Sequence, residues 1–269
     1  MNSTIFHYSS GTKKTDLLIV KNEIRYCDEW GLGNIIYSSK EKTNFFCKML
    51  ENEIFVYQGH RLFATYELLS EPYCHRCGYP GVATENCSLH DDLYGFNKIY
   101  VMGKYSSRRK SLLEQHIISL KENKFYAKPL GYALACIASN RYEDILNAEM
   151  LVPVPLHPTE YGNRSFNQSL ELAKIVGEQL NIPVSFVLMK KRVARMVGLT
   201  REERSRAVAG LYDVLPSRRK LVGNKYVVLV DDVITTGFTV SECAKVLRKY
   251  GAYKVDVLGL ARTVLLTDE

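Results

Sequence analysis

The chain has 269 residues, of which 46% are hydrophobic and 24% charged. This balance is typical of a globular protein and argues against wholesale disorder or a collagen-like architecture. The length exceeds a typical domain of about 100 to 200 residues, so two or three structural units are expected. No stretch reaches the roughly 18 consecutive apolar residues of a membrane span, and residues 1–16 lack the apolar core of a secretory signal. We therefore expect a cytoplasmic protein without membrane insertion.

Residues 1–70 consist of short polar and aromatic runs with period-two alternation, such as DLLIV and EIFVYQGHRLFATYEL. This alternation is typical of half-buried strands and predicts a small strand-rich unit. No motif in the segment assigns it a role.

Four residues that follow have the spacing of metal ligands, C-x2-C-x9-C-x2-H: Cys74, Cys77, Cys87 and His90. Two such knuckles can present four ligands to one tetrahedral zinc ion. Four protein ligands leave no open position, so the predicted zinc is structural rather than catalytic. The alternative is a polar loop without metal, which has few apolar residues to hold it. Cysteines elsewhere, at 27, 47, 136 and 243, are interpreted as buried thiols.

The rest of the chain alternates strands and helices. Helices are predicted over 107–123, 129–140, 165–180 and 239–250, and strands over 98–103, 149–155, 183–189, 226–230 and 254–261. Ser165 and Gln168 have the spacing of a capping box at the start of the third helix. Alternation of this kind predicts an α/β fold with a mostly parallel sheet, helices on both faces, and ligands at the carboxyl ends of the strands.

The stretch from Val227 to Thr239 reads VVLVDDVITTGFT. A buried strand leads to two carboxylates, and a short Thr-Thr-Gly loop then opens a helix. Backbone N–H groups at a helix start attract an anion, and threonine hydroxyls can donate to phosphate oxygens. Asp231 and Asp232 suit sugar hydroxyls. The pattern therefore predicts a sugar phosphate site, although an acid pair followed by an ordinary turn and helix cap would explain the residue types singly.

Eleven basic residues lie between Lys190 and Lys225, against Glu202, Glu203 and Asp213. Such a segment favours an anion such as pyrophosphate, a nucleotide or a nucleic-acid backbone. A solvated basic face remains the alternative.

The motif from 227 to 239 resembles the signature with which type I phosphoribosyltransferases bind phosphoribosyl pyrophosphate (PRPP). More narrowly, residues 71–263 resemble the ComF family, competence-associated proteins that join a zinc ribbon to a phosphoribosyltransferase-like domain. The segments that carry the resemblance are CHRCG with CSLH, LVPVPLHP, NRSFNQ, GLTREER, VVLVDDVITTG and LART. The resemblance does not cover residues 1–70, which stay the strand-rich region predicted from their alternation. It implies a zinc-binding ribbon over 71–97 and a phosphoribosyltransferase-like domain over 98–269.

Carried over by residue, the resemblance implies that Asp231 and Asp232 bind the ribose 2- and 3-hydroxyls. It implies a 5-phosphate loop made of Thr235, Thr236, Gly237, Phe238 and Thr239. A pyrophosphate loop is implied at Val154, Pro155, Leu156 and His157, with Arg164 as a nearby anion contact. A loop that closes over the site is implied around Lys191, Arg192 and Arg195. Residues 159–163 depart from the family, which often has more arginines there, and Phe238 is bulkier than usual.

Two functions follow from the resemblance. The first is transfer of phosphoribose from PRPP, with Mg²⁺, to an unidentified base or amine. The second is a role in DNA uptake, through binding of single-stranded DNA or a helicase partner, with little or no transferase activity. An assembly scaffold with an inactive site is a third possibility, which the intact Asp-Asp and Thr-Thr-Gly make less favourable.

Overall fold

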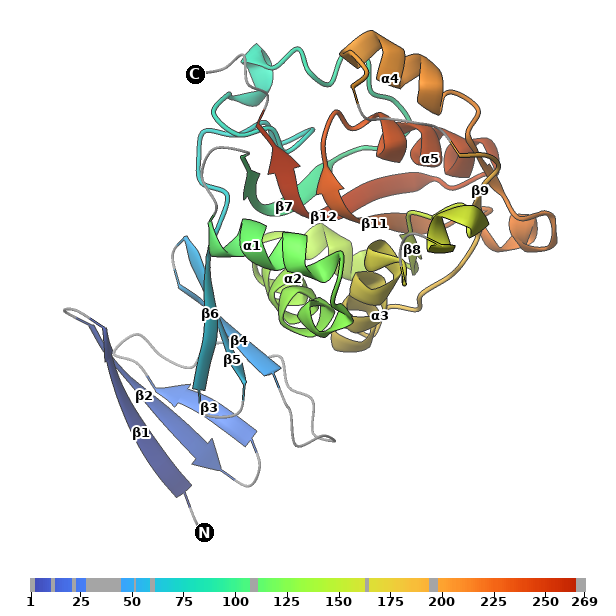
Figure 1. Cartoon of the computed structure of the whole chain (residues 1–269). Coiled ribbons are helices and arrows are strands. Elements are labelled where there is room, and N and C mark those ends of the chain that lie inside the picture. The colour runs from blue at the N-terminus through green and yellow to red at the C-terminus, as the bar shows by residue number, and fades with distance from the viewer. Residues whose placement is uncertain are drawn as a thin grey trace.

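The computed structural model describes residues 3–10, 13–20, 23–27, 45–50, 52–58, 61–106, 111–162, 165–193 and 198–264. Its centre is a four-stranded parallel sheet with the strand order β7-β12-β11-β8 (Figure 1). The strands are β7 (Ile99–Tyr105), β12 (Lys254–Thr263), β11 (Tyr226–Ile234) and β8 (Met150–Pro153). Val228 of β11 pairs with Asp256 on one side and with Leu151 on the other. The predicted parallel sheet is therefore confirmed.

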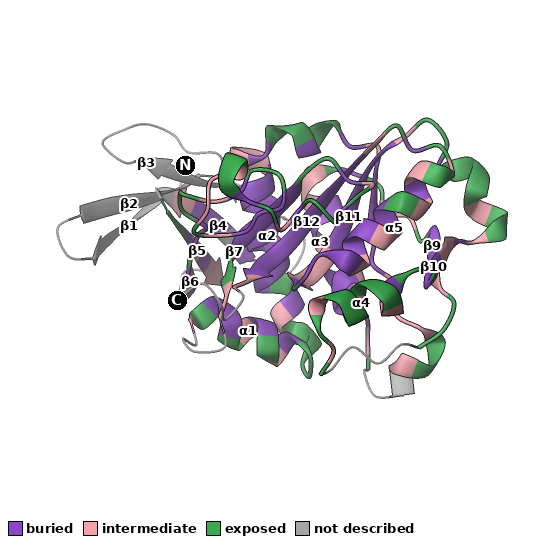
Figure 2. Ribbon diagram, turned by 90° about the horizontal axis from the view of Figure 1, so that it is seen from above, coloured by how far each residue is buried: buried purple, intermediate pink, exposed green. Residues whose placement is uncertain are grey.

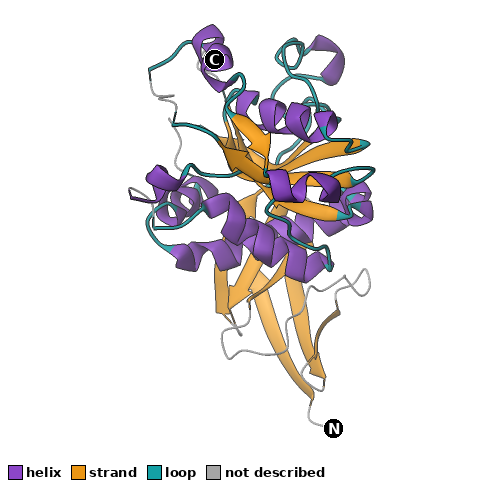
Figure 3. Ribbon diagram, turned by 90° about the vertical axis from the view of Figure 1, so that its right-hand side faces the viewer, coloured by secondary structure: helices purple, strands orange, loops and turns teal. Residues whose placement is uncertain are grey.

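Helices cover both faces of this sheet (Figures 1 and 3). One face carries α1 (Leu112–Leu120), α2 (Ala127–Arg141) and α3 (Gln168–Leu180), and the other carries α5 (Phe238–Lys249). The side chains of β11 alternate accordingly, because Val228 and Val230 pack in the core with α2 and α3 whereas Val227 and Leu229 pack with α5. Most residues of the sheet strands are buried (Figure 2), as expected for a parallel sheet covered on both sides, and the residues that are not buried lie toward the strand ends.

All four predicted helices begin at a different residue than predicted, and the N-caps explain the difference for α1 and α3. Helix α1 begins at Leu112, because the side chain of Ser111 accepts from the backbone N–H of Glu114 in a capping box. Helix α3 begins at Gln168, and its cap is Asn167, whose side chain accepts from the N–H of Leu170. The predicted capping box of Ser165 with Gln168 is therefore wrong.

The N-terminal region is strand-rich, as predicted. It forms two antiparallel sheets, β1-β2-β3 and β4-β5-β6. Their strands are β1 (Ser3–Ser10), β2 (Lys13–Val20), β3 (Glu23–Cys27), β4 (Phe45–Leu50), β5 (Glu53–Gln58) and β6 (Arg61–Glu67). The second sheet shares a core with α1 and α2, where Phe45 lies against Tyr132 and the Tyr66 hydroxyl contacts His116 Nδ1 at 2.7 Å. The three-part division of the chain stays a prediction.

The remaining elements are short. Strands β9 (Leu188–Lys190) and β10 (Tyr212–Val214) pair antiparallel, and α4 (Arg201–Val208) lies on the same side of the sheet as α5 (Figure 1). Short 3-10 helices span Thr84–Asn86, Lys124–Tyr126, Glu143–Asn147, Pro158–Gly162 and Pro216–Leu221. A helix long and apolar enough to cross a membrane is absent from the described ranges.

Candidate functional site

Strand β11 runs further than the sequence indicates. The predicted strand ends at Val230, whereas β11 continues to Ile234, and its last residues pair with Ala261 and Arg262 of β12. The predicted end is therefore wrong, because β12 is long enough to pair with the acidic residues and beyond. Asp231 and Asp232 still lie toward the carboxyl end of the sheet, which is the edge where parallel α/β sheets bind ligands.

The two carboxylates are half-buried and held by short hydrogen bonds. Oδ1 of Asp231 accepts from the Ser169 hydroxyl at 2.9 Å and from the Asp232 backbone N–H at 3.0 Å. Oδ1 of Asp232 accepts from the N–H of Val233 at 2.7 Å. These bonds fix the orientation of both groups before any ligand arrives. Ser169 was not predicted, since nothing in the sequence places the first turn of α3 beside β11.

The Thr-Thr-Gly loop connects β11 to α5. Gly237 has φ 87° and is the N-cap of α5, and no side chain caps the helix there. The first N–H groups of a helix have no partner within the helix, so this uncapped end can bind an anion. The Thr235 side chain is exposed, whereas Thr236 is buried. Helix α5 begins at Phe238, one residue before the predicted start.

Two other predicted residues of this loop turn toward the protein. The Phe238 ring is buried in the core on the α5 side, with the Arg201 guanidinium 5.0 Å from its centre. The hydroxyl of Thr239 hydrogen-bonds Tyr212, a buried residue of β10. Burial raises the pKa of Tyr212, and the charge of Asp231 raises it further, so its hydroxyl stays protonated.

The segment after β8 is held beside the acid pair. The N–H of Val154 donates to Val230 O at 3.0 Å, and Nδ2 of Asn167 donates to Val154 O at 3.0 Å. Further along, the N–H of His157 donates to a Glu160 carboxylate oxygen at 2.7 Å, and Lys190 Nζ donates to the same carboxylate at 2.8 Å. Pro155 and Leu156, also predicted here, are partly buried. Glu160, which the sequence shows only as a departure from the family, stabilises this loop through its hydrogen bonds with His157 and Lys190.

The basic segment separates into two groups. Lys190 is paired with Glu160, and Arg201 donates to Leu89 O at 2.8 Å and lies 3.5 Å from Asp92. Lys191 and Arg192 are exposed instead. The predicted anion contacts Arg164 and Arg195 lie outside the described residues.

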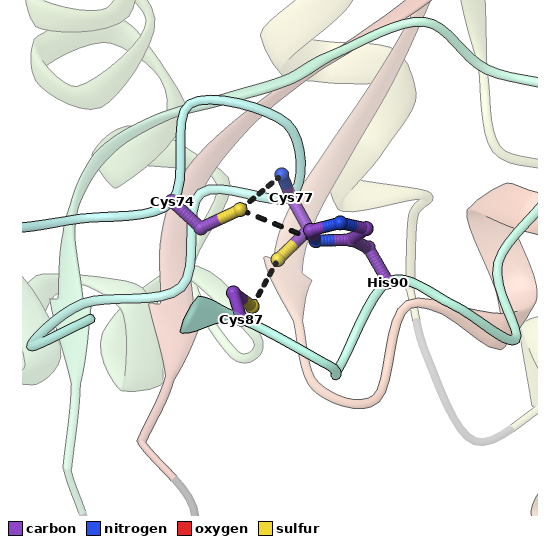
Figure 4. Close-up of side chains that lie close together, drawn as sticks. All are labelled: Cys74, Cys77, Cys87 and His90. Atoms are coloured by element: carbon purple, nitrogen blue, oxygen red, sulfur yellow. Dashed lines mark hydrogen bonds between the residues drawn. The ribbon is translucent and has the colours of Figure 1, made fainter. Parts of the chain in front are cut away.

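The four predicted metal ligands come together in one buried cluster (Figure 4). The candidate ligand atoms of Cys74, Cys77, Cys87 and His90 all lie within 4.8 Å of one another. Sγ of Cys77 and Sγ of Cys87 are 3.7 Å apart, and Cys74 Sγ lies 3.3 Å from His90 Nδ1. Zinc bonds of about 2.3 Å to sulfur place two sulfurs about 3.8 Å apart in a tetrahedron. Three thiols and an imidazole at these distances fit a metal such as zinc.

A charged residue that sequence reasoning missed lies beside this cluster. Arg262 of β12 is fully buried, and its guanidinium donates to the carbonyls of Ile234, at 3.1 Å, and Thr235. It also hydrogen-bonds the Cys77 sulfur. Burial raises the pKa of Cys77 to about 12, and the charge of Arg262 opposes this rise. The signal in the sequence was a single arginine inside an apolar strand, since a buried charge requires a partner.

Known proteins are similar to large parts of this chain. The model of the phosphoribosyl transferase domain family matches residues 167–263. Competence protein F of Haemophilus influenzae is 28% identical over 205 residues, which cover 73% of this chain and 87% of that protein. The resemblance to the ComF family is confirmed. The DNA utilization protein YhgH of Escherichia coli, at 26% identity over 71% of this ComF-like chain and 84% of its own length, is a further relative.

A second group of relatives matches a shorter part of the chain. Amidophosphoribosyltransferase of Staphylococcus aureus is 32% identical over 117 residues, covering 43% of the ComF-like chain and 21% of that enzyme. The residues that match the phosphoribosyl transferase domain family include the acid pair, the Thr-Thr-Gly loop, α5 and β12.

Proposed function

We propose that this chain binds PRPP at the carboxyl edge of the parallel sheet and transfers its phosphoribosyl group to an unidentified base or amine. The observation that carries the proposal is the pair Asp231 and Asp232 beside the uncapped start of α5, with the loop after β8 held next to them by Asn167. Carboxylates suit the hydroxyls of a sugar, and free N–H groups suit a phosphate.

Each part of the site has a proposed role. Asp231 and Asp232 accept hydrogen bonds from the ribose hydroxyls, and residues 235–239 hold the 5-phosphate. Residues 154–157 and Arg164 contact the pyrophosphate, while Lys191, Arg192 and Arg195 approach from the basic segment. Mg²⁺ bound with PRPP would neutralise charge on the leaving pyrophosphate.

The proposed reaction requires little general acid-base catalysis by the protein. Cleavage of the bond between C1 and pyrophosphate builds positive charge on the ribose ring, so the chain must hold the sugar, stabilise the departing anion and exclude water. The hydrogen bonds that fix Asp231 supply rigidity, because they orient its carboxylate in advance.

We also propose that Cys74, Cys77, Cys87 and His90 hold one structural zinc ion. The support is the spacing of the four ligand atoms and their burial. With four protein ligands, no position is left for substrate.

Calorimetric titration of PRPP, with and without Mg²⁺, tests the main proposal. Asp232→Asn removes a carboxylate charge at little change of shape and should weaken binding at least about tenfold, while Glu122→Gln, an exposed carboxyl just beyond α1, should leave it unchanged. Equal affinity of the Asp232→Asn variant and the unaltered protein would contradict the proposed site.

A second function is favoured by a separate observation, the match to two relatives named for competence and DNA utilization. Under this alternative the chain binds single-stranded DNA, or a helicase partner, with little or no transferase activity. The exposed side chains of Lys191, Arg192 and Arg206 offer the charge for a nucleic-acid backbone.

A further inference from the structure

One side chain, that of Arg262, contacts both the metal cluster and the proposed phosphate loop. Arg262 reaches Cys77 with its guanidinium and donates from the same group to the carbonyls of Ile234 and Thr235. Thr235 begins the loop that leads into α5. A single buried residue therefore contacts both a candidate metal ligand and the backbone of the proposed phosphate site.

The charge of Arg262 requires a counter-charge. It is fully buried, and among the described residues no carboxylate forms an ion pair with it. Arg201, another charge that acts on it, is also positive. Three thiolates and a neutral imidazole around a divalent metal leave one net negative charge, which complements one guanidinium. A metal-loaded cluster is thus the chemical state in which Arg262 is electrostatically satisfied.

Other contacts join the same two segments. Arg201 donates to Leu89 O, between two of the candidate ligands, and stacks on Phe238, the first residue of α5. The N–H of Tyr94 donates to Ser241 Oγ at 2.8 Å, and Ser241 Oγ donates to Tyr94 O at 2.9 Å. The loop that bears the ligands is therefore packed along the first turns of α5.

We infer that Arg262 is a positioning residue that makes the phosphate loop depend on the metal cluster. If PRPP binds as proposed, the consequence is that loss of the metal weakens PRPP binding, although the metal does not touch the substrate. This consequence rests on the proposed function. The coupling is reciprocal, so PRPP should also raise the affinity of the cluster for the metal.

Hydrogen exchange tests the inference without any ligand or variant. The full-length protein, with its metal content measured, is compared before and after treatment with a chelator. Exchange of residues 234–246 should accelerate at least about tenfold, whereas exchange in α2, on the opposite face of the sheet, should not change. Unchanged exchange over 234–246, or an equal rise in α2, would overturn the inference.

Variants at Arg262 separate its charge from its bridging geometry. Arg262→Met should release the metal to a competing chelator at least about tenfold faster than the unaltered protein, because the thiolates lose their counter-charge. Arg262→Lys keeps the positive charge but lacks the planar guanidinium that donates to two carbonyls. The rate of metal release should therefore stay within about threefold of the unaltered protein, while the amides of residues 234–246 exchange faster than in that protein. Lys220→Met, at an exposed site, controls for loss of one charge. Metal release from Arg262→Met at the unaltered rate would contradict the contact with Cys77.

Titration of PRPP completes the experiment. If the unaltered protein binds PRPP, both Arg262 variants should bind it at least about fivefold more weakly. If the unaltered protein does not bind PRPP, the proposed function fails, while the exchange and metal-release measurements still decide the connection through Arg262.

Discussion

Gly237 lies where two constraints meet. Its φ of 87° is a conformation that residues with a Cβ rarely adopt, and a Cβ built there would lie 2.7 Å from Leu93 Cδ1. Leu93 belongs to the loop that bears the candidate metal ligands and is fully buried. The glycine is thus required both by the backbone turn and by close packing against that loop.

Gly237→Ala should therefore lower the free energy of unfolding by about 2 to 4 kcal/mol, from strain and overpacking together. Urea denaturation measures it. Gly210→Ala is a matched control, because Gly210 has φ 66° but nothing lies within 4 Å of its Cβ position. It should lose only the strain, about 1 kcal/mol. Equal losses of unfolding free energy in the two variants would show that the contact of the new Cβ with Leu93 does not destabilise the protein.

The sequence predicts the residues that would bind a ligand or metal better than it predicts the residues that hold them in place. The four metal ligands are recognisable because their spacing is short and local. Ser169 and Arg262 were missed, since each acts across the fold on a residue far away in sequence.

Asn167 links two elements at the site. Its Oδ1 caps α3 by accepting from Leu170 N–H at 3.2 Å, and its Nδ2 holds the carbonyl of Val154. One buried amide thus starts a helix and positions the loop after β8.

Asn167→Ala should lower the free energy of unfolding by about 1 to 3 kcal/mol, since it removes the cap and leaves Val154 O unpaired. Asn167→Ser retains a capping oxygen but lacks the amide donor. We expect it to recover part of the stability and yet to bind PRPP more weakly than the unaltered protein. Thermal unfolding and calorimetry measure the two effects, and full PRPP affinity in Asn167→Ser would contradict the role of the contact with Val154.

Element types could be predicted because the periodicity of apolar residues is strong in each. Element ends could not. The run of apolar residues indicates an end of β11 at Val230, but pairing with β12 carries the strand through both aspartates. Likewise, both Ser165 and Asn167 can cap a helix, and only the tertiary contact with Val154 favours Asn167.

At the scale of the whole molecule, the described residues form two cores, one on each face of the sheet. The first joins α1–α3 and the sheet β4-β5-β6, and the second joins the metal cluster, α5 and β10. The alternation of strands and helices predicts both faces, but it cannot show that the N-terminal strands share the first core.

Elemental analysis of protein purified without added metal should find one zinc per chain. Removal of the zinc with a chelator should loosen the second core first, because a structural metal contributes directly to folding, while α2 and α3 stay protected. Folded protein with a zinc content near zero would rule out this metal assignment.

Single-stranded DNA binding, if the second function holds, should be sequence-tolerant and strongest at low salt. Charge reversal at Lys191, Arg192 and Arg195 should lower the affinity and flatten its salt dependence, by about 0.7 in logarithmic slope for each phosphate that the variant no longer neutralises. The matched control reverses Lys104, Lys121 and Lys128, three exposed lysines outside the basic segment, with the same change of net charge. Similar losses of affinity in both triple variants would show that the basic segment is not the binding surface. Absence of binding at low salt would exclude single-stranded DNA as the ligand of this second function.

The contact of Tyr94 with Ser241 joins residues 147 positions apart in the chain. During synthesis the cysteine loop leaves the ribosome long before α5, the helix on which it rests. Its ligands can gather early because they are close in sequence, but its packing surface comes late, and such long-range contacts form slowly. A nascent chain that stops before α5 should therefore bind zinc only weakly. Its affinity for zinc should reach the value of the full-length protein only when α5 and β12 are complete.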